Sequence, residues 1–152
     1  MESIQVIATT FEGTRAAIET AVPLAKGCGA SLVVIVPNVT PYPLPADGTV
    51  DATERAVDQY QRWLEELGGE GHVRIFLVPT VEDLIARAIT RDATVVVGGA
   101  SGRWRMSPEE RFANRLGRAG YHVVFAATGS ASSSRRIPFP AAAAFILFIA
   151  CR

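Results

Sequence analysis

Two glycines with the spacing of a phosphate-binding loop follow an apolar run in the second half of the chain. Gly99 and Gly102 come directly after the sequence TVVVG, and the next helix pattern begins shortly after them. Backbone N–H groups in such a loop, at the start of a helix, can bind phosphate oxygens. A lone Gly-x-x-Gly is more often a tight turn, but its place after a predicted strand favours a nucleotide site.

The helix that follows these glycines has its own capping chemistry. In the sequence SPEE, Ser107 is placed to be the N-cap, Pro108 to occupy the first helical position, and Glu110 to close a capping box. Glu109 and Glu110 are stabilised by the positive end of the helix dipole, but they repel a triphosphate from the same N–H groups. We therefore expect this helix start to satisfy its own donors.

An arginine cluster surrounds the same segment and leaves two interpretations open. It can hold an anion without further help, or it can form a solvated face paired with Glu109 and Glu110. The second is the commoner fate of a run of charges. The cluster consists of Arg103, Arg105, Arg111, Arg115 and Arg118.

Other candidate chemistry in the chain is sparse. His72 and His122 have no cysteine or acid at ligand spacing, so we expect no metal site. Ser101 and Ser107 have no base placed beside them by the sequence, which argues against a nucleophile, and we expect no catalytic residue. Trp104 is a partner contact or a lid that packs over the loop, and we favour packing. Trp63, in a helical pattern, is expected in the core.

Composition limits the class of protein. The chain has 152 residues, 49% of them hydrophobic, which suits one compact domain. Fifteen basic and fifteen acidic residues balance each other, so we expect no nucleic-acid partner. The first residues lack the pattern of an export signal, and the two cysteines lie far apart without metal-ligand spacing. We expect a cytoplasmic protein.

Strand and helix patterns alternate along the chain. Short β-branched runs indicate buried parallel strands, and the segments between them have helical spacing with capping residues or glycines at their ends. The order is βαβαβαβαβ, which predicts an α/β fold with helices on both faces of an open parallel sheet. The predicted strands are 4–8, 31–36, 73–78, 94–98 and 122–126, and the predicted helices are 14–27, 50–67, 80–91 and 108–118.

The sequences PTVEDLIARAI and RDATVVVGGASGR, in this layout, resemble the universal stress protein family. The resemblance covers roughly residues 3–128. It implies a five-stranded parallel sheet in the order 3-2-1-4-5 and frequent dimers paired through the last strand, here His122 to Ala126. The family has members that bind ATP and members that do not. Open sheets of this kind bind ligands where the strand order reverses, between the first and fourth strands.

The resemblance also implies candidate ligand-binding residues, namely Thr9, Thr10, Val36, Gly99, Gly102 and Arg103. ATP-binding relatives have an Asp at the end of the first strand, where this chain has Thr9. Their second glycine is followed after nine residues by Gly-Ser or Gly-Thr. Counting forward reaches Phe112 and Ala113, and aligning from the last strand reaches Glu109 and Glu110. Since neither count gives the pair, we expect ATP to bind weakly or not at all, and no cofactor.

The C-terminal segment differs in composition from the rest. We assign 1–128 to the universal stress protein-like domain and 129–152 to a Ser/Arg linker and an apolar tail. The apolar stretch 141–150 is about half of the ~20 residues that span a bilayer, so a membrane anchor is not expected. The tail packs on the domain or a partner, is a non-native extension, or, as the third choice, forms a weak membrane-surface hook.

These observations predict a non-catalytic, stress-linked regulatory or binding module that forms homodimers. One alternative is an ATP-binding or slowly ATP-hydrolysing member with a degenerate site. Another is an assembly subunit that recruits an unknown protein partner through the last strand and the apolar tail. Family likeness alone does not decide among them.

Overall fold

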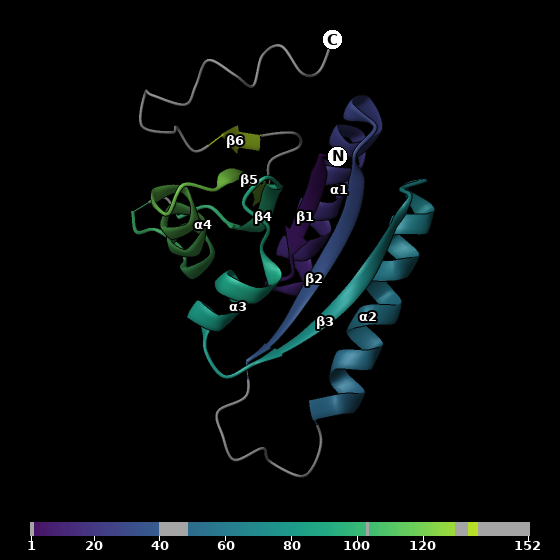
Figure 1. The fold of residues 1–152 in the computed structure, drawn as a ribbon, viewed down its shortest axis with the longest axis horizontal. Helices are drawn as coiled ribbons and strands as arrows, with labels where there is room; N and C mark the ends of the chain where they lie inside the picture. Colours follow the sequence, from purple (N-terminus) through teal and green to yellow (C-terminus); the bar gives the residue numbers. More distant parts are fainter. Residues whose placement is uncertain (1, 40–48, 103, 130–133, 137–152) are drawn as a thin grey trace.

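The computed structural model describes residues 2–39, 49–102, 104–129 and 134–136. Its elements follow the predicted alternation of strands and helices (Figure 1). The strands are β1 (Ser3–Ile7), β2 (Ser31–Val39), β3 (Gly71–Val78), β4 (Thr94–Ala100), β5 (His122–Thr128) and β6 (Ser134–Arg136). The helices are α1 (Phe11–Cys28), α2 (Thr49–Glu66), α3 (Val81–Ala88) and α4 (Pro108–Arg118).

The sheet has the order β3-β2-β1-β4-β5-β6. The first five strands are parallel, which confirms the predicted α/β architecture and the order 3-2-1-4-5. The sixth strand, which the sequence did not predict, pairs antiparallel with β5. The order reverses between β1 and β4, because the chain leaves β1 toward β2 and later returns to the other side of β1.

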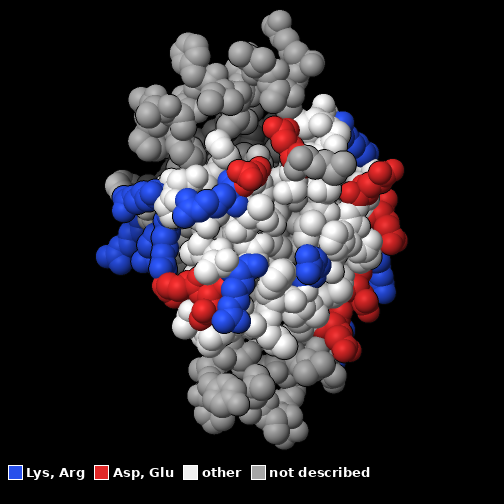
Figure 2. Space-filling view, in the orientation of Figure 1, with Lys and Arg blue, Asp and Glu red and all other residues white. Residues whose placement is uncertain are grey.

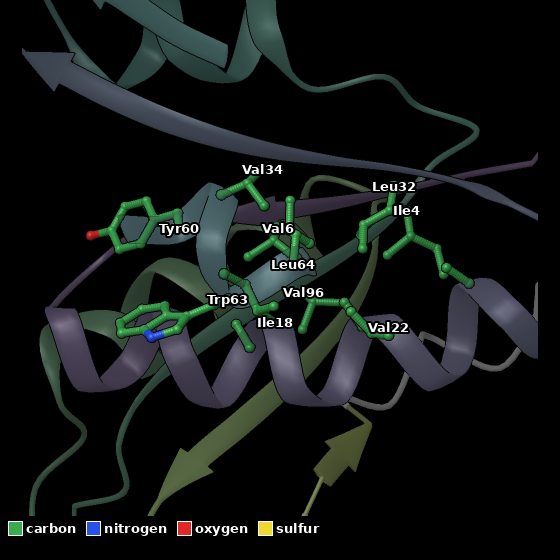
Figure 3. Close-up of a cluster of buried hydrophobic side chains, with 14 of the residues drawn as sticks. Ile4, Val6, Ile18, Val22, Leu32, Val34, Tyr60, Trp63, Leu64 and Val96 are labelled. Carbon is green, nitrogen blue, oxygen red and sulfur yellow. The ribbon is translucent and has the colours of Figure 1, made fainter. Parts of the chain in front are cut away.

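One face of the sheet is covered by α1 and α2 (Figure 3). Ile18 of α1 and Leu64 of α2 are fully buried against the strands, and Val34 of β2 belongs to the same buried cluster. Trp63 is buried in this cluster, as the sequence predicts, and its ring contacts Tyr60 and Phe11. Burial of these side chains away from water is the main stabilising term on this face.

The opposite face is covered by α3, which packs on β2 and β3, and by α4, which packs on β4 and β5. Leu84 of α3 and Leu116 of α4 are buried there. A polar side chain is also buried here. The Gln5 amide donates to the Ala88 carbonyl oxygen and accepts a hydrogen bond of 2.9 Å from the Thr90 backbone N–H. Gln5 therefore fixes the connection from α3 to β4 and leaves none of its own polar atoms without a partner.

Several element ends differ from the sequence prediction, and three of them have a clear physical cause. Helix α1 begins earlier, because the hydroxyl of Thr10 accepts a hydrogen bond from the Gly13 N–H as its N-cap. Strand β2 continues through Pro37, beyond the last residue of β2 that pairs with β1, so the missing N–H is tolerated. Helix α3 ends at Ala88, since Ile89 is extended and the Thr90 N–H bonds to Gln5.

The edge of β5 that the predicted dimer would use is paired with β6. Val124, Phe125 and Ala126 lie opposite Arg136, Arg135 and Ser134 respectively. A dimer through β5 would therefore need β6 to move or to contribute its own outer edge. Dimer formation and the boundary near residue 128 both stay predictions, and the apolar tail lies outside the described residues.

Within the described ranges, no helix has both the length and the apolar character needed to cross a membrane.

Candidate functional site

The candidate site lies at the carboxyl ends of β1 and β4, the two strands between which the order reverses. Two connections meet there, the turn from β1 to α1 and the loop from β4 to α4. Thr9 and Thr10 belong to the first connection, and the segment from Ser101 to Ser107 belongs to the second. In open α/β sheets this is the usual place for a ligand.

Threonine hydroxyls hold the first connection, which we call the β1 turn (residues 8–14). The Thr9 hydroxyl donates a hydrogen bond of 2.5 Å to the Gly98 carbonyl oxygen and so ties this turn to β4. The Thr9 backbone N–H donates to the hydroxyl of Thr14, which is fully buried and donates in turn to the Thr10 carbonyl oxygen. The turn is thus held entirely by uncharged groups.

Two glycines bring the β1 turn into direct contact with β4. A Cβ atom on Gly98 would lie 1.8 Å from the Gly13 carbonyl oxygen, and a Cβ atom on Gly13 would lie 2.5 Å from the Gly98 carbonyl oxygen. Only hydrogen atoms fit at such distances, so the two backbones touch. The first turn of α1 consequently packs directly against the end of β4.

A carboxylate holds the second connection, which we call the β4 loop (residues 99–107). Glu110 Oε2 accepts hydrogen bonds from the backbone N–H groups of Gly102, at 3.2 Å, and Ser107, at 3.0 Å. Its Oε1 accepts a third from the Ser101 hydroxyl, at 3.2 Å. The Glu110 backbone N–H donates back to the Ser107 hydroxyl, which completes the predicted capping box.

These donors are of the kind that bind phosphate oxygens in nucleotide sites, namely loop N–H groups and a hydroxyl at a helix start. Here an anion of the chain itself accepts their hydrogen bonds. Glu109 lies beside them, since a Cβ atom on Gly99 would be 2.5 Å from the Cβ of Glu109. Gly102 allows the loop to fold back on itself, because a Cβ atom there would be 1.5 Å from the Arg105 carbonyl oxygen. Both glycines therefore have a packing role.

An open depression of about 250 Å³ lies between the β1 turn and the start of α4. It is lined by Thr9, Thr10, Pro108, Glu109 and Phe112. The wall facing the threonines is thus a glutamate flanked by apolar side chains. A carboxylate at this place disfavours an anionic ligand.

Figure 2 shows lysine and arginine side chains gathered on the side of the molecule where α4 lies. The members of the cluster on α4 are exposed, which agrees with a solvated face. Between described residues, the ion pair of this cluster joins Arg115 to Glu82 of α3. The Arg115 guanidinium, which donates a hydrogen bond to Glu82, holds the pKa of that carboxyl below its ordinary value.

The structure brings some of the predicted site residues together. Thr9, Thr10, Gly99 and Gly102 lie around the two connections, and the threonines share the depression with Glu109. Val36 does not line it, because its side chain is buried in the core under α1 and α2. Arg103 lies outside the described residues.

Trp104 corrects a sequence expectation. Its side chain is 94% exposed, so it does not pack over the loop, and Met106 nearby is 58% exposed. The sequence also did not predict a role for Thr14, whose hydroxyl accepts a hydrogen bond from the Thr9 backbone N–H. A Thr in the first turn of a helix was the available signal, but the contact with the Thr9 N–H depends on the turn geometry.

No protein family model matches this chain, and no curated protein is detectably similar to it in sequence. Solved structures are similar in fold. A universal stress protein family member from Burkholderia pseudomallei is 22% identical, with 81% of this chain and 94% of that chain covered and a TM-score of 0.55. A universal stress protein from Archaeoglobus fulgidus is 15% identical, with coverage of 82% and 92% and a TM-score of 0.63.

A third structure is a universal stress protein family protein from Arabidopsis thaliana with AMP bound. It is 15% identical, with coverage of 84% and 93% and a TM-score of 0.54. This chain therefore has the fold of the universal stress proteins. At such identities the likeness establishes the fold and leaves the ligand to be argued from the site.

Proposed function

We propose that this protein is a non-catalytic, stress-linked regulatory module of the universal stress protein type that binds ATP weakly or not at all. The observation that carries the proposal is the position of Glu110. Its carboxylate accepts hydrogen bonds from Gly102, Ser107 and Ser101, the donors that a phosphate would need. To bind there, a phosphate must displace an ionised group that is already hydrogen-bonded.

The β1 turn supports the same proposal. An Asp at position 9 would offer a carboxylate acceptor to a ligand. The Thr9 hydroxyl instead donates its hydrogen bond to the Gly98 carbonyl oxygen. The contact of Gly13 with Gly98 brings the helix start against β4 at the place where the strand order reverses. The module is proposed to act in the cytoplasm through protein contacts, without a cofactor.

The second candidate function is weak nucleotide binding by a degenerate site, which could also hydrolyse ATP slowly. The AMP bound to the Arabidopsis structure, together with the depression beside Thr9 and Thr10, favours this candidate. Candidate contacts remain Thr9, Thr10, Gly99, Gly102 and Arg103. Glu109 and Glu110 are the residues that separate the two candidates, because they lie where the phosphates would.

Calorimetric titration with Mg-ATP tests the proposal. The unaltered protein is expected to bind in the millimolar range or not detectably, because each lost charge-assisted contact costs about 1.5 to 3 kcal/mol. The double variant Glu109→Gly, Glu110→Ser removes both charges and supplies the Gly-Ser pair. We expect it to bind ATP at least about tenfold more tightly than the unaltered protein.

A matched control is Glu66→Ser, which removes an exposed acid from the last turn of α2. This variant should leave ATP affinity unchanged, since Glu66 belongs neither to the β1 turn nor to the β4 loop. Micromolar binding by the unaltered protein would overturn the proposal and favour the second candidate. Equal gains in ATP affinity for the control and the double variant would show a general effect of charge and exclude Glu110 as the residue that limits ATP binding.

A further inference from the structure

The described sheet ends at β3, and this strand has exposed apolar side chains on one face. Ile75 is 43% exposed and Leu77 is 67% exposed, both on the face that α2 covers. On the opposite face the Arg74 guanidinium lies 5.4 Å from the centre of the Phe76 ring. Edge strands are usually blunted by proline, by charged side chains or by a bulge, because unpaired N–H and C=O groups invite another strand. Of these features, β3 has the exposed Arg74.

The two edges of the sheet differ in this respect. At the other end, the chain supplies β6, which pairs with residues 124–126 of β5. Strand β3 has eight residues, contains neither proline nor lysine, and pairs with β2 along its whole length on the inner side. Its outer side is therefore the longer template for a further strand among the described elements.

We propose that β3 is the surface through which two copies of this chain associate, by antiparallel pairing of β3 with β3 of the second copy. A twofold axis perpendicular to the sheet keeps each side chain on its own face of the sheet. Since residues that lie opposite one another point to the same face, the axis must lie between one residue and the same residue of the second copy. Pairing would join the two sheets into one. Strand addition of this kind draws its affinity from backbone hydrogen bonds and its specificity from the side chains opposite one another.

The side chains of β3 favour one register. An axis at Arg74 would place two guanidinium groups opposite one another, which is destabilising. An axis at Ile75 pairs residues 72–78, places Arg74 opposite the Phe76 ring of the second copy, and brings Leu77 opposite Val73. This register repeats between copies the contact that Arg74 and Phe76 already make within the strand.

The same register covers the exposed apolar side chains. Ile75 would meet Ile75 of the second copy at the axis, and each Leu77 would lie beside a Val73, so these β-branched and aliphatic pairs stabilise the ladder. Helix α2 packs behind β3 on this face, and the apolar strip would lie between the two α2 helices. The second copy is thus a self-complementary partner for this edge.

Sedimentation velocity on the full-length chain tests the proposal, with Ile75→Lys and Leu77→Lys as variants. We expect the unaltered chain to dimerise and each variant to raise the dimer dissociation constant by about tenfold or more, since Ile75→Lys places two like charges at the axis. The matched control is Met106→Lys, which changes a comparably exposed apolar side chain on the β4 loop. It should leave the dissociation constant unchanged.

Hydrogen exchange gives a readout that requires no variant. Backbone amides of β3 should exchange more slowly in a concentrated sample than in a dilute one, while those of β5 should not change. A chain that stays monomeric, a dimer that neither lysine variant weakens, or concentration-dependent protection confined to β5 would each overturn the proposal.

Discussion

The β1 turn and the β4 loop are both connections from a strand to a helix, and each is held by its own capping groups, but they are held by different chemistry. The β1 turn relies on uncharged hydroxyls, of which that of Thr14 is buried, and on the direct contact between Gly13 and Gly98. The β4 loop relies on the carboxylate of the half-buried Glu110. The first connection is part of the core, whereas the second is held by an electrostatic contact.

The candidate site therefore combines one connection that is fixed by the core with one whose contacts a ligand could replace. Contacts between buried neutral groups do not depend on pH or on salt. Contacts made by a charged carboxylate near the surface are screened by salt. Changes in the β1 turn should therefore affect the whole fold, and changes around α4 should produce smaller effects that depend on solution conditions.

The largest effect is expected from Gly98→Ala. The added methyl group would lie 1.8 Å from the Gly13 carbonyl oxygen, a contact that only a shift of α1 against β4 can relieve. We expect the free energy of unfolding to fall by about 3 kcal/mol or more, measured by urea denaturation. The control Gly27→Ala, where the methyl group meets nothing, should range from no change to about 1 kcal/mol of stabilisation. Equal changes in the free energy of unfolding for the two variants would show that the Gly13–Gly98 contact does not limit the side chain at position 98.

A smaller effect is expected from Thr14→Val, which keeps the shape of the side chain and removes its hydroxyl. The Thr9 backbone N–H then loses its acceptor, which should cost about 1 to 3 kcal/mol in the same measurement. This loss should be the same at pH 5 and pH 8, because no titrating group takes part. The control is Thr20→Val, which removes a hydroxyl that donates to the Ala16 carbonyl oxygen of the same helix. This variant should lose clearly less stability than Thr14→Val. A strongly pH-dependent loss in Thr14→Val would contradict the assignment of the β1 turn to neutral groups.

The smallest effect is expected from Glu82→Gln, which removes the ion pair between α3 and α4. Because Arg115 lowers the pKa of Glu82 in the folded protein, the pair stabilises the fold above the ordinary glutamate range and loses this contribution as the pH falls through the lowered pKa. The melting temperature should fall slightly at pH 7, less in high salt, and not at all in strong acid. The same substitution in an Arg115→Gln background should have no effect, and an undiminished effect there would exclude the pair as its cause.

The sequence was sufficient to predict those features that depend on neighbouring residues. The five parallel strands followed from β-branched runs, since strands buried on both faces must be apolar throughout. The caps at Thr80 and Ser107 followed from local spacing, and both hydroxyls accept the expected N–H. The capping box of Glu110 was predicted for the same reason.

Features that depend on the meeting of distant segments were not predictable in this way. The resemblance placed Thr9 near the end of the fourth strand, but no local pattern predicts the hydrogen bond from its hydroxyl to the Gly98 carbonyl oxygen. Helix α3 stops early because Gln5, far away in the chain, accepts the hydrogen bond of the Thr90 N–H. The hydrogen bond from Gly102 to Glu110 likewise depends on how the β4 loop folds back. Trp104 was expected to pack, because a large aromatic side chain on a loop usually finds a neighbour, and its exposure depends on the path of that loop.

The chain's two tryptophans give it a pair of optical reporters that require no labelling. Trp63 is buried against α1, and Trp104 projects into water from the β4 loop, so their emission maxima and their access to iodide should differ. The blue-shifted, shielded component would follow unfolding of the core. The red-shifted, quenchable component would respond when a molecule settles on the loop, so folding and binding can be observed separately in one sample.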